Sequence, residues 1–584
     1  MLRRKFVPIF FLFAWAAVAV TANAEPGRVV IPNDKCLGCH GARDLARELP
    51  DGKKRLLFVD EKIRQSSAHA KVNCADCHAD LTAEHPGGTE AAKPVECAPC
   101  HKEEARVYAG SIHGLSPAMG SSEAASCTSC HGAHDMLSRK NPNSPVFKLN
   151  LARTCGKCHQ ERLKHYRDTY HGKAMSLGQP NVASDVAACC DCHGAHDILP
   201  VSNPASHLSK QNIRATCTKC HPGATAGFTE YIPHADPLDG KKFPLLHLAF
   251  VLMTGLLLGV FAFFGGHTLL WLARSVWIYR HDSKTYRETK IEIRRDDEWF
   301  TRFTPFDRFL HFLVVTSFLL LVVTGMPLKF YSTDWAKTIF EILGGAQTAH
   351  SLHRFGALVT FLYFALHLIT LAKAAWLNRG ILRNPGTGRW QLGRFWAAVF
   401  GADSMVPSMQ DWRDFVAHQK WFFGRGQKPQ FERWTYWEKF DYFAVFWGIF
   451  AIGLSGLVMW FPQFFTAFMP GWVINIALII HSDEALLAAG FIFTVHFFNT
   501  HFRLEKFPMD DVIFSGRISK TEMIHERKRW YDRLVSEGRL DEHRVRDEWE
   551  RWKTIARPIG FAFFGIGLVL LALIIYAMIS RLTH

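Results

Sequence analysis

The sequence Cys-x-x-Cys-His occurs seven times between Cys36 and His221 of this 584-residue chain. Two thiols followed directly by a histidine are typical of c-type haem attachment, in which the thiols form thioether bonds and the histidine binds iron. The thioether cysteines would be Cys36, Cys39, Cys74, Cys77, Cys97, Cys100, Cys127, Cys130, Cys155, Cys158, Cys189, Cys192, Cys217 and Cys220. The proximal iron ligands would be His40, His78, His101, His131, His159, His193 and His221. We therefore expect seven c haems in a loop-rich stretch of chain that folds only around its cofactors.

Other uses of paired cysteines fit this pattern poorly. Fourteen of the fifteen cysteines lie in the motifs, and Cys190 is left over as a small side chain that we expect to be buried. A disulfide framework has no need of a histidine after every second cysteine. Zinc accepts a Cys-x-x-Cys pair, but it does not explain the constant histidine.

Six-coordinate haems would require seven further histidines as distal ligands. An internal repeat helps to select them, because two pairs of motifs share the same 28-residue spacing. The matching residues are Cys127, Cys155, His113 and His134 in the first copy and Cys189, Cys217, His171 and His196 in the second. The predicted distal ligands are His69, His113, His134, His171, His196, His234 and His247, with His85, His165 and His207 as weaker alternatives. Closed coordination of this kind favours electron transfer over chemistry on a substrate.

The N-terminus has the pattern of an export signal. Arg3, Arg4 and Lys5 precede an apolar stretch at 6–20, and small residues suited to cleavage follow at 22–24. An uncleaved anchor helix is the alternative interpretation, although the apolar run is short for a span of about 20 residues. We expect a signal peptide at 1–24 and an exported heptahaem cytochrome c domain at 25–240.

Six apolar segments follow, each long enough to cross a membrane. They lie at about 245–273, 309–330, 354–376, 441–463, 473–498 and 558–580. Lysine and arginine concentrate in 279–307, 378–440 and 502–557, which places these loops on the cytoplasmic side. The formal charge of +15 is therefore interpreted as membrane topology, and no nucleic-acid partner is expected.

The predicted fold is mostly α, with a loop-rich multihaem domain and a six-helix transmembrane domain. The predicted membrane parts are a first helix at 241–280, a bundle at 300–505, a basic cytoplasmic segment at 506–557 and a last helix at 558–584. The expected location is a bacterial inner membrane, in contact with the lipid bilayer and with the haem c domain in the periplasm.

Histidines within the apolar segments predict two further haems, of b type. Ionisable residues inside a membrane are rare and are functional candidates by default, although a lone one is more often a satisfied core residue. His353 and His481 fall near the outer surface and would share one haem. His311 and His496 fall near the inner surface and would share the other, with His367 as an alternative ligand. Facing helices of a bundle commonly hold cofactors in this way.

These residues resemble a known family. Arg302 to His311 with Thr324-Gly325, then His353-Arg354 and His481 to His496, are similar to the di-haem cytochrome b subunits of membrane formate dehydrogenases and nickel hydrogenases. One departure is that the last two histidines are usually 14 residues apart in the family and are 15 apart here. The resemblance implies a four-helix bundle of cytochrome b type and a quinone site near the inner haem, for which Asn499 and His501 are candidates. No other catalytic residue is predicted.

The whole chain resembles CbcL-like fusions of a multihaem cytochrome c with a di-haem cytochrome b. That resemblance implies a menaquinol oxidoreductase of anaerobic respiration, which passes electrons from the membrane quinone pool through two b haems and seven c haems to periplasmic c-type cytochromes. Three alternatives remain open at this stage. Electrons could run in reverse and reduce quinone, the c domain could reduce a small oxyanion or sulfur compound, or the chain could be a non-enzymatic haem anchor.

Overall fold

The computed structural model describes residues 31–49, 52–82, 84–87, 92–117, 119–121, 123–178, 186–289, 297–545 and 549–583. The predicted signal peptide lies outside the described residues. The chain divides into two compact units, Met1–Pro145 and Val146–His584, and each is described by itself. The last three Cys-x-x-Cys-His motifs thus share a compact unit with the membrane helices, while the domain boundary predicted at 240 stays a prediction.

The first unit consists of short helices and loops around four motifs. Its elements are α1 (Asn33–His40), β1 (Ala46–Glu48), β2 (Lys54–Leu56), α2 (Glu61–Gln65), α3 (Cys74–Cys77), α4 (Lys102–Ala109), α5 (Ile112–Leu115) and α6 (Cys127–His131). Strands β1 and β2 pair antiparallel, with Arg47 opposite Arg55. Ile31 is the one hydrophobic residue that is buried among the described residues of this unit. The polypeptide alone therefore builds no apolar core here, as expected of a chain that folds around cofactors.

The second unit begins with the last three motifs, which pack directly against membrane helices. Its first elements are α7 (Lys148–Gly156), α8 (Gln160–Asp168), α9 (Tyr170–Leu177), α10 (Cys189–His193), α11 (Ile213–Thr218) and η2 (Gly227–Glu230). The Thr225 hydroxyl donates to the Thr466 carbonyl at 2.8 Å, and the Asn475 side chain donates to the Ile232 carbonyl at 2.8 Å. Leu177 is buried in a cluster with Phe340 and other apolar residues.

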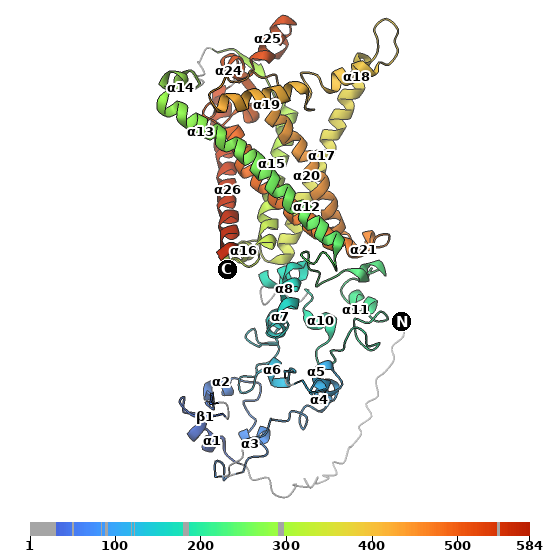
Figure 1. The fold of residues 1–584 in the computed structure, drawn as a ribbon, viewed down its shortest axis with the longest axis vertical. Helices are drawn as coiled ribbons and strands as arrows, with labels where there is room; N and C mark the ends of the chain where they lie inside the picture. Colours follow the sequence, from blue (N-terminus) through green and yellow to red (C-terminus); the bar gives the residue numbers. More distant parts are fainter. Residues whose placement is uncertain are drawn as a thin grey trace, which may run out of the picture. The chain divides into compact units, whose positions relative to one another are not determined.

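Six helices among the described residues are long and apolar enough to span a membrane (Figure 1). They are α12 with η3 and α13 (Pro244–His281), α15 (Pro305–Lys329), α17 (Ala346–Leu377), α20 (Tyr436–Trp460), α22 with η5 and η6 (Val473–Phe502) and the apolar part of α26 (Arg557–Ser580 within Trp549–Thr583). Helix α15 packs along α17, and α20 packs along α22. The prediction of a mostly α protein with six membrane helices is confirmed.

The structure shows that α15 and α20 are repeats of one helix, each 25 residues long. Both begin after a threonine whose hydroxyl accepts a hydrogen bond from the backbone of the third helical residue, Asp307 in α15 and Glu438 in α20. Twenty residues after that threonine, each helix has a hydroxyl residue followed by glycine. These pairs are Thr324-Gly325 in α15 and Ser455-Gly456 in α20. Two similar helix hairpins, α15–α17 and α20–α22, thus form the bundle.

Helix α22 changes its winding before it ends. Residues Ile492–His496 and Phe498–Phe502 form the π-helical turns η5 and η6. A π-bulge accommodates one additional residue within a helix, and such bulges are frequent at functional sites. This is the physical reason why His481 and His496 can be 15 residues apart where the resembling family has 14.

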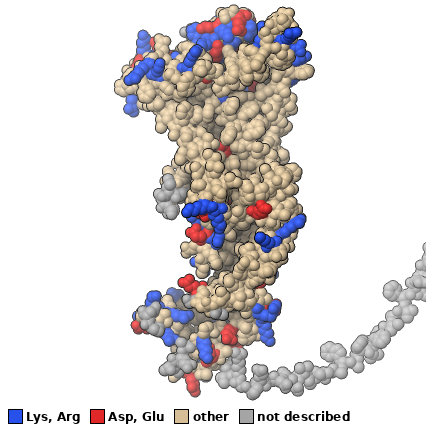
Figure 2. All heavy atoms as spheres, turned by 45° about the vertical axis from the view of Figure 1, so that its right-hand side comes forward, with Lys and Arg blue, Asp and Glu red and all other residues tan. Residues whose placement is uncertain are grey.

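Charged side chains gather at one end of the bundle, which we call the charged end (Figure 2). It is formed by α14 (Ser283–Thr289), α19 (Met409–Phe422), α23 (Val512–Ser515), α24 (Lys520–Glu526), α25 (Lys528–Ser536), η7 (Leu540–His543) and the three-stranded sheet β4–β3–β5. Its strands are β3 (Trp299–Thr301), β4 (Arg517–Ser519) and β5 (Arg544–Val545). The remaining short elements are α16 (Asp334–Ile342), η4 (Arg379–Leu382), α18 (Leu392–Val399) and α21 (Pro462–Phe465).

Candidate functional site: paired histidines for haem

Among the described residues of the first unit, three histidine pairs each include one motif histidine. The ring centroids are 6.3 Å apart for His40 and His85, 6.0 Å for His69 and His101, and 6.3 Å for His78 and His134. Two imidazoles on opposite sides of one metal ion, with metal–nitrogen distances of about 2 Å, would place their centroids roughly 6 Å apart. The pairs therefore have the spacing of bis-histidine iron sites.

The second unit contains two more such pairs. His193 lies opposite His234 with centroids 6.4 Å apart, and His171 lies opposite His221 at 6.2 Å. Of the predicted distal ligands, the structure thus brings His69, His134, His171 and His234 to a motif histidine. For the motifs ending in His131 and His159, the distal ligand stays a prediction from the sequence, with His113 and His196 as candidates.

The three weaker candidates for distal ligands, His85, His165 and His207, have different partners in the structure. His85, ranked among the weaker alternatives, faces His40, and no repeat or flanking motif in the sequence marks it. The His207 ring instead contacts the Asp197 carboxylate at 2.7 Å, and His165 lies 3.7 Å from Glu161. His247 has its Nδ1 2.9 Å from the Pro237 carbonyl oxygen, so its role as a distal ligand stays a prediction.

Some consecutive motifs within one unit are neighbours in space. In the first unit the first cysteines of two such pairs are in hydrogen-bond contact, Cys36 with Cys74 and Cys97 with Cys127. Cys155 and Cys189 make the same contact in the second unit. All fifteen thiols are free of disulfides. Cys190 is half-buried and packs against the cluster of Met175 and Ala188.

The outer pair, His353 of α17 and His481 of α22, is brought together as the sequence predicts, with ring centroids 6.1 Å apart. Each ring is held by its Nδ1. The Thr324 hydroxyl lies 2.8 Å from Nδ1 of His353, and the Ile452 carbonyl lies 3.0 Å from Nδ1 of His481. Both Nε2 atoms are thereby left for a metal, because a hydrogen bond at one ring nitrogen fixes the other as the ligand.

Glycines make room beside both rings. A Cβ added at Gly325 would lie 3.2 Å from Cε1 of His353, and one added at Gly456 would lie 3.1 Å from Cε1 of His481. The two glycines occupy equivalent positions in α15 and α20. The histidine pair and the glycine pair together form a cradle that fits a haem b on both of its faces.

The inner pair is His311 of α15 and His496 of α22. His311 lies within electrostatic range of His496 and His501. Nδ1 of His496 contacts the Asp441 carboxylate at 2.9 Å, which again leaves Nε2 for a metal. These residues fit a second b-type ligand pair.

His367, the alternative inner ligand, has a different partner. Its Nε2 lies 2.7 Å from the Tyr442 hydroxyl. In the helix repeat, Tyr442 of α20 occupies the position that His311 occupies in α15. The second hairpin therefore has Tyr442 at the position where the first has His311. His367 faces this tyrosine instead of a second histidine.

The quinone candidates lie next to the inner pair. Asn499 is 3% exposed, and its side-chain oxygen is buried without a hydrogen-bond partner among the described residues. Nδ1 of His501 accepts a hydrogen bond from the backbone of Asp510 at 3.3 Å. Their assignment to quinone binding stays a prediction.

Two contacts connect the pair His171–His221, which contains the histidine of the seventh motif and is called the seventh-motif pair, with the membrane helices. The Tyr170 hydroxyl, from the residue before His171, lies 3.4 Å from Nδ1 of His350, one turn before His353 on α17. The Gln463 side chain of α21 lies 3.4 Å from Nδ1 of His221. The pair His171–His221 is therefore directly adjacent to the helices that carry the outer pair.

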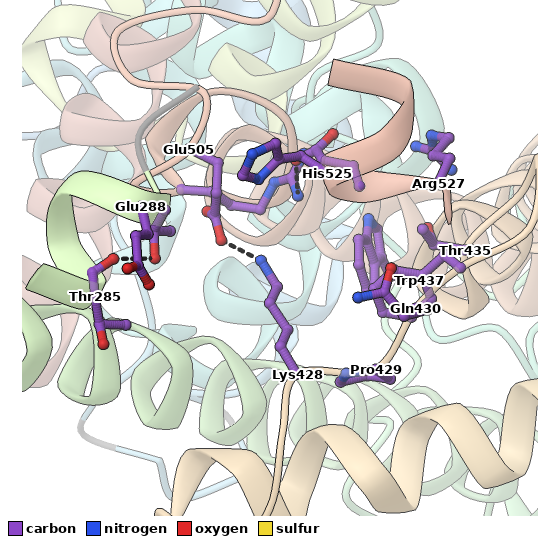
Figure 3. Close-up of a pocket in the computed structure, with 14 residues that line it drawn as sticks. Thr285, Glu288, Lys428, Pro429, Gln430, Thr435, Trp437, Glu505, His525 and Arg527 are labelled. Carbon is purple, nitrogen blue, oxygen red and sulfur yellow. Dashed lines mark hydrogen bonds and ion pairs between the residues drawn. The ribbon is translucent and has the colours of Figure 1, made fainter. Parts of the chain in front are cut away.

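A cavity of about 180 Å³ lies within the charged end (Figure 3). Its lining includes Lys428, which is ion-paired with Glu505, and Arg503, whose guanidinium lies 3.1 Å from Glu526. Burial raises the pKa of Glu526, but the charges of Arg503, Lys506 and Arg527 outweigh it and hold that pKa well below its ordinary value. The cavity is thus lined by buried, mutually paired charges.

Part of the chain is similar to the cytochrome b556(fdo) subunit of formate dehydrogenase from Escherichia coli strain K12. The two are 30% identical over 141 residues, which cover 21% of this chain and 64% of the subunit. The subunits from strains O6:H1 and O157:H7 match equally well. The chain therefore spans slightly less than two thirds of the length of these relatives. No family model and no solved structure matches the chain.

Proposed function

We propose that this protein is a membrane-bound quinol oxidoreductase that passes electrons from menaquinol through two b haems into seven c haems and on to periplasmic acceptors. The similarity to a cytochrome b subunit supports the membrane half of this proposal. The seven Cys-x-x-Cys-His motifs and the five described pairs of a motif histidine with a second histidine support the other half.

The observation that carries the proposal is the adjacency of the two kinds of histidine pair. Tyr170 and His350 join the residue before His171 to the helix turn before His353. Gln463 lies against the other histidine of the seventh-motif pair. A path from the outer pair to the pair His171–His221 therefore crosses a few directly touching side chains. Electrons that leave the membrane helices would enter the c haems at the seventh motif.

Bound haems supply the one-electron redox chemistry, and the protein supplies ligands, hydrogen bonds and burial. Thr324 and Ile452 orient the two ligands of the outer pair, and Asp441 orients His496 of the inner pair. A carboxylate bonded to the ligand histidine makes the ring a stronger electron donor, whereas a hydroxyl or carbonyl does so less. The inner site is therefore expected to have the lower reduction potential, which favours electron movement from the inner pair towards the outer pair.

The test uses the purified full-length protein with its haems. Pyridine haemochrome spectra are expected to give seven c haems and two b haems per chain. Anaerobic mixing with a reduced menaquinol analogue is expected to reduce the b haems first and the c haems after them. The His481→Ala variant serves as the matched control, because it keeps every c motif but loses one ligand of the outer pair.

Two results would overturn the proposal. A wild-type protein without b-type haem would remove the membrane half. Rapid reduction of the c haems by quinol in the His481→Ala variant would show that electrons bypass the outer pair. Reduction of a quinone analogue by the pre-reduced protein, without the opposite reaction, would instead assign the reverse direction.

A further inference from the structure

A partly buried tyrosine at the charged end lies between two buried histidines. The Tyr436 hydroxyl, at the start of α20, is 2.6 Å from Nε2 of His267 on α13 and 2.8 Å from Nδ1 of His418 on α19. His267 is 6% exposed and His418 is fully buried. His267 lies before the predicted bundle at 300–505, His418 lies in the basic loop at 378–440, and neither belongs to the histidine pairs assigned to haem.

The contacts of these three residues exclude a further haem site. The Tyr436 hydroxyl fills the space between the two imidazoles, which a metal would need. Aromatic rings close the surroundings, with Trp271 and Phe422 each 4.5 Å from His418 between ring centroids. Because the Tyr436 hydroxyl occupies the place between the histidines, the three residues can exchange protons with each other but cannot hold a ligand there.

One end of this arrangement lies beside the charged cavity. His418 packs against Phe431 and Trp437, with centroids 6.1 and 5.8 Å away, and both of those rings also line the cavity (Figure 3). Nε2 of His418 is buried and has no hydrogen-bond partner among the described residues. A buried nitrogen of this kind is usually satisfied by an ordered water, which the neighbouring cavity can supply.

The other end lies towards the helix that carries the inner pair. Phe264, three residues before His267, packs against Phe440 of α20 at 3.9 Å and Phe491 of α22 at 5.5 Å between centroids.

Burial, and then the charges of Lys428, His267 and Arg503, lower the pKa of His418 well below its ordinary value. His418 is therefore neutral, with one N–H and one free acceptor nitrogen.

We propose that His267, Tyr436 and His418 form a proton relay between the membrane interior beside α22 and the charged cavity, and that it carries protons of the quinol reaction. This inference rests on the proposed function, because oxidation of a quinol releases two protons with its two electrons. The relay gives these protons a route out of the apolar bundle that does not place a full charge on any member.

The transfer balances bond by bond. Initially, Nε2–H of His267 donates to Tyr436, the Tyr436 hydroxyl donates to Nδ1 of His418, and His418 holds its proton on Nε2. As a proton binds Nδ1 of His267, the Nε2 proton moves in the same concerted step to the Tyr436 oxygen. The former Tyr436 proton moves to Nδ1 of His418, and the Nε2 proton of His418 leaves towards the cavity. Three bonds to hydrogen form and three break, one proton enters and one leaves, and no electron is transferred.

The test compares Tyr436→Phe with the matched variant Tyr442→Phe on the same helix. Tyr442 also contacts a histidine through its hydroxyl, but it has one histidine partner where Tyr436 has two. Each holoprotein is mixed anaerobically with menaquinol analogue or with dithionite, in H₂O and in D₂O, and b-haem reduction is followed by absorbance. Tyr436→Phe is expected to slow the quinol-driven phase about tenfold or more, within the usual range for a lost proton-transfer group. Its solvent isotope effect is expected to rise, while dithionite reduction and haem content stay at the wild-type values.

The outcomes separate the two proposals. An unchanged quinol-driven rate in Tyr436→Phe, with both b haems present, overturns the relay alone. An equal slowing in Tyr442→Phe also overturns it, because loss of any tyrosine hydroxyl would then suffice. A wild-type protein that quinol cannot reduce overturns the proposed function and the relay with it. If Tyr436→Phe fails to bind haem, His418→Gln tests the same step, and wild-type kinetics in that variant overturn the relay.

Discussion

Replacing Gly456 by valine should remove one of the two proposed b haems and leave the other proposed cofactors in place. The Cβ of the new side chain would lie 3.1 Å from Cε1 and 3.3 Å from Nδ1 of His481. Carbon atoms in contact prefer separations of about 3.5–4.0 Å, so the imidazole must move by about 0.4–0.9 Å. Metal sites tolerate ligand displacements of about 0.2 Å. The required movement is thus at least twice what a bound iron allows, before the two valine methyls are considered.

The control for this variant is Gly448→Val on the same helix, because a Cβ at Gly448 meets no atom within 4 Å. Both variants carry the same change in helix propensity, so that a difference between them reports the contact with His481. Pyridine haemochrome spectra should give one b haem for Gly456→Val and two for Gly448→Val, with equal c haem in both. Two b haems with a wild-type spectrum in Gly456→Val would refute the assignment of this cradle to haem.

Three further predictions follow from the pairs and the charged end. His311→Ala should lose one b haem whereas His367→Ala should retain both, by the same spectra; the reverse result would exchange the inner ligand. His85→Ala should produce a high-spin signal in the oxidised electron paramagnetic resonance spectrum and His207→Ala should not, and a low-spin spectrum for His85→Ala would contradict the pairing with His40. Because the folded-state pKa of Glu526 is depressed, its stabilising effect is present above its unfolded value of about 4.3 and is lost as the pH falls below it. Limited proteolysis at the charged end should therefore accelerate below about pH 4, and less so in Glu526→Gln.

The thioether and proximal residues can be named from the sequence alone, because a Cys-x-x-Cys-His motif contains its own attachment geometry, and the c haems themselves stay a prediction. The pairing of His353 with His481 also followed, since helix rise and apolar length fix the depth of a residue in a membrane. Distal ligands are a different problem, because any histidine can reach an iron if the intervening loops allow it. His85 shows this difficulty, as it lies 45 residues beyond His40 with no distinguishing neighbours.

Other features depend on tertiary packing, which the spacing of apolar residues along the sequence does not encode. The π-helical turns of α22 accommodate the 15-residue spacing of His481 and His496. One additional residue in a sequence does not by itself specify that a helix forms a π-bulge. The basic residues of 378–440 predict only that this loop lies on the cytoplasmic side. Within it, α19 buries His418 completely against Tyr436 and Trp271. That site unites residues from the three helices α13, α19 and α20, and none of them is unusual in its own surroundings.

The first unit buries a single described hydrophobic residue, and under the proposed function this would tie the amount of folded protein to the supply of haem and iron. A unit without its own apolar interior has no stable fold while haem is scarce, so that each unfilled motif in it leaves a segment that proteases can cleave. A cell short of haem would lose this protein by degradation and would not accumulate an inactive reserve. The abundance of the mature protein is thereby expected to follow haem synthesis more closely than transcription, and respiration through it would adjust to iron without a dedicated regulator.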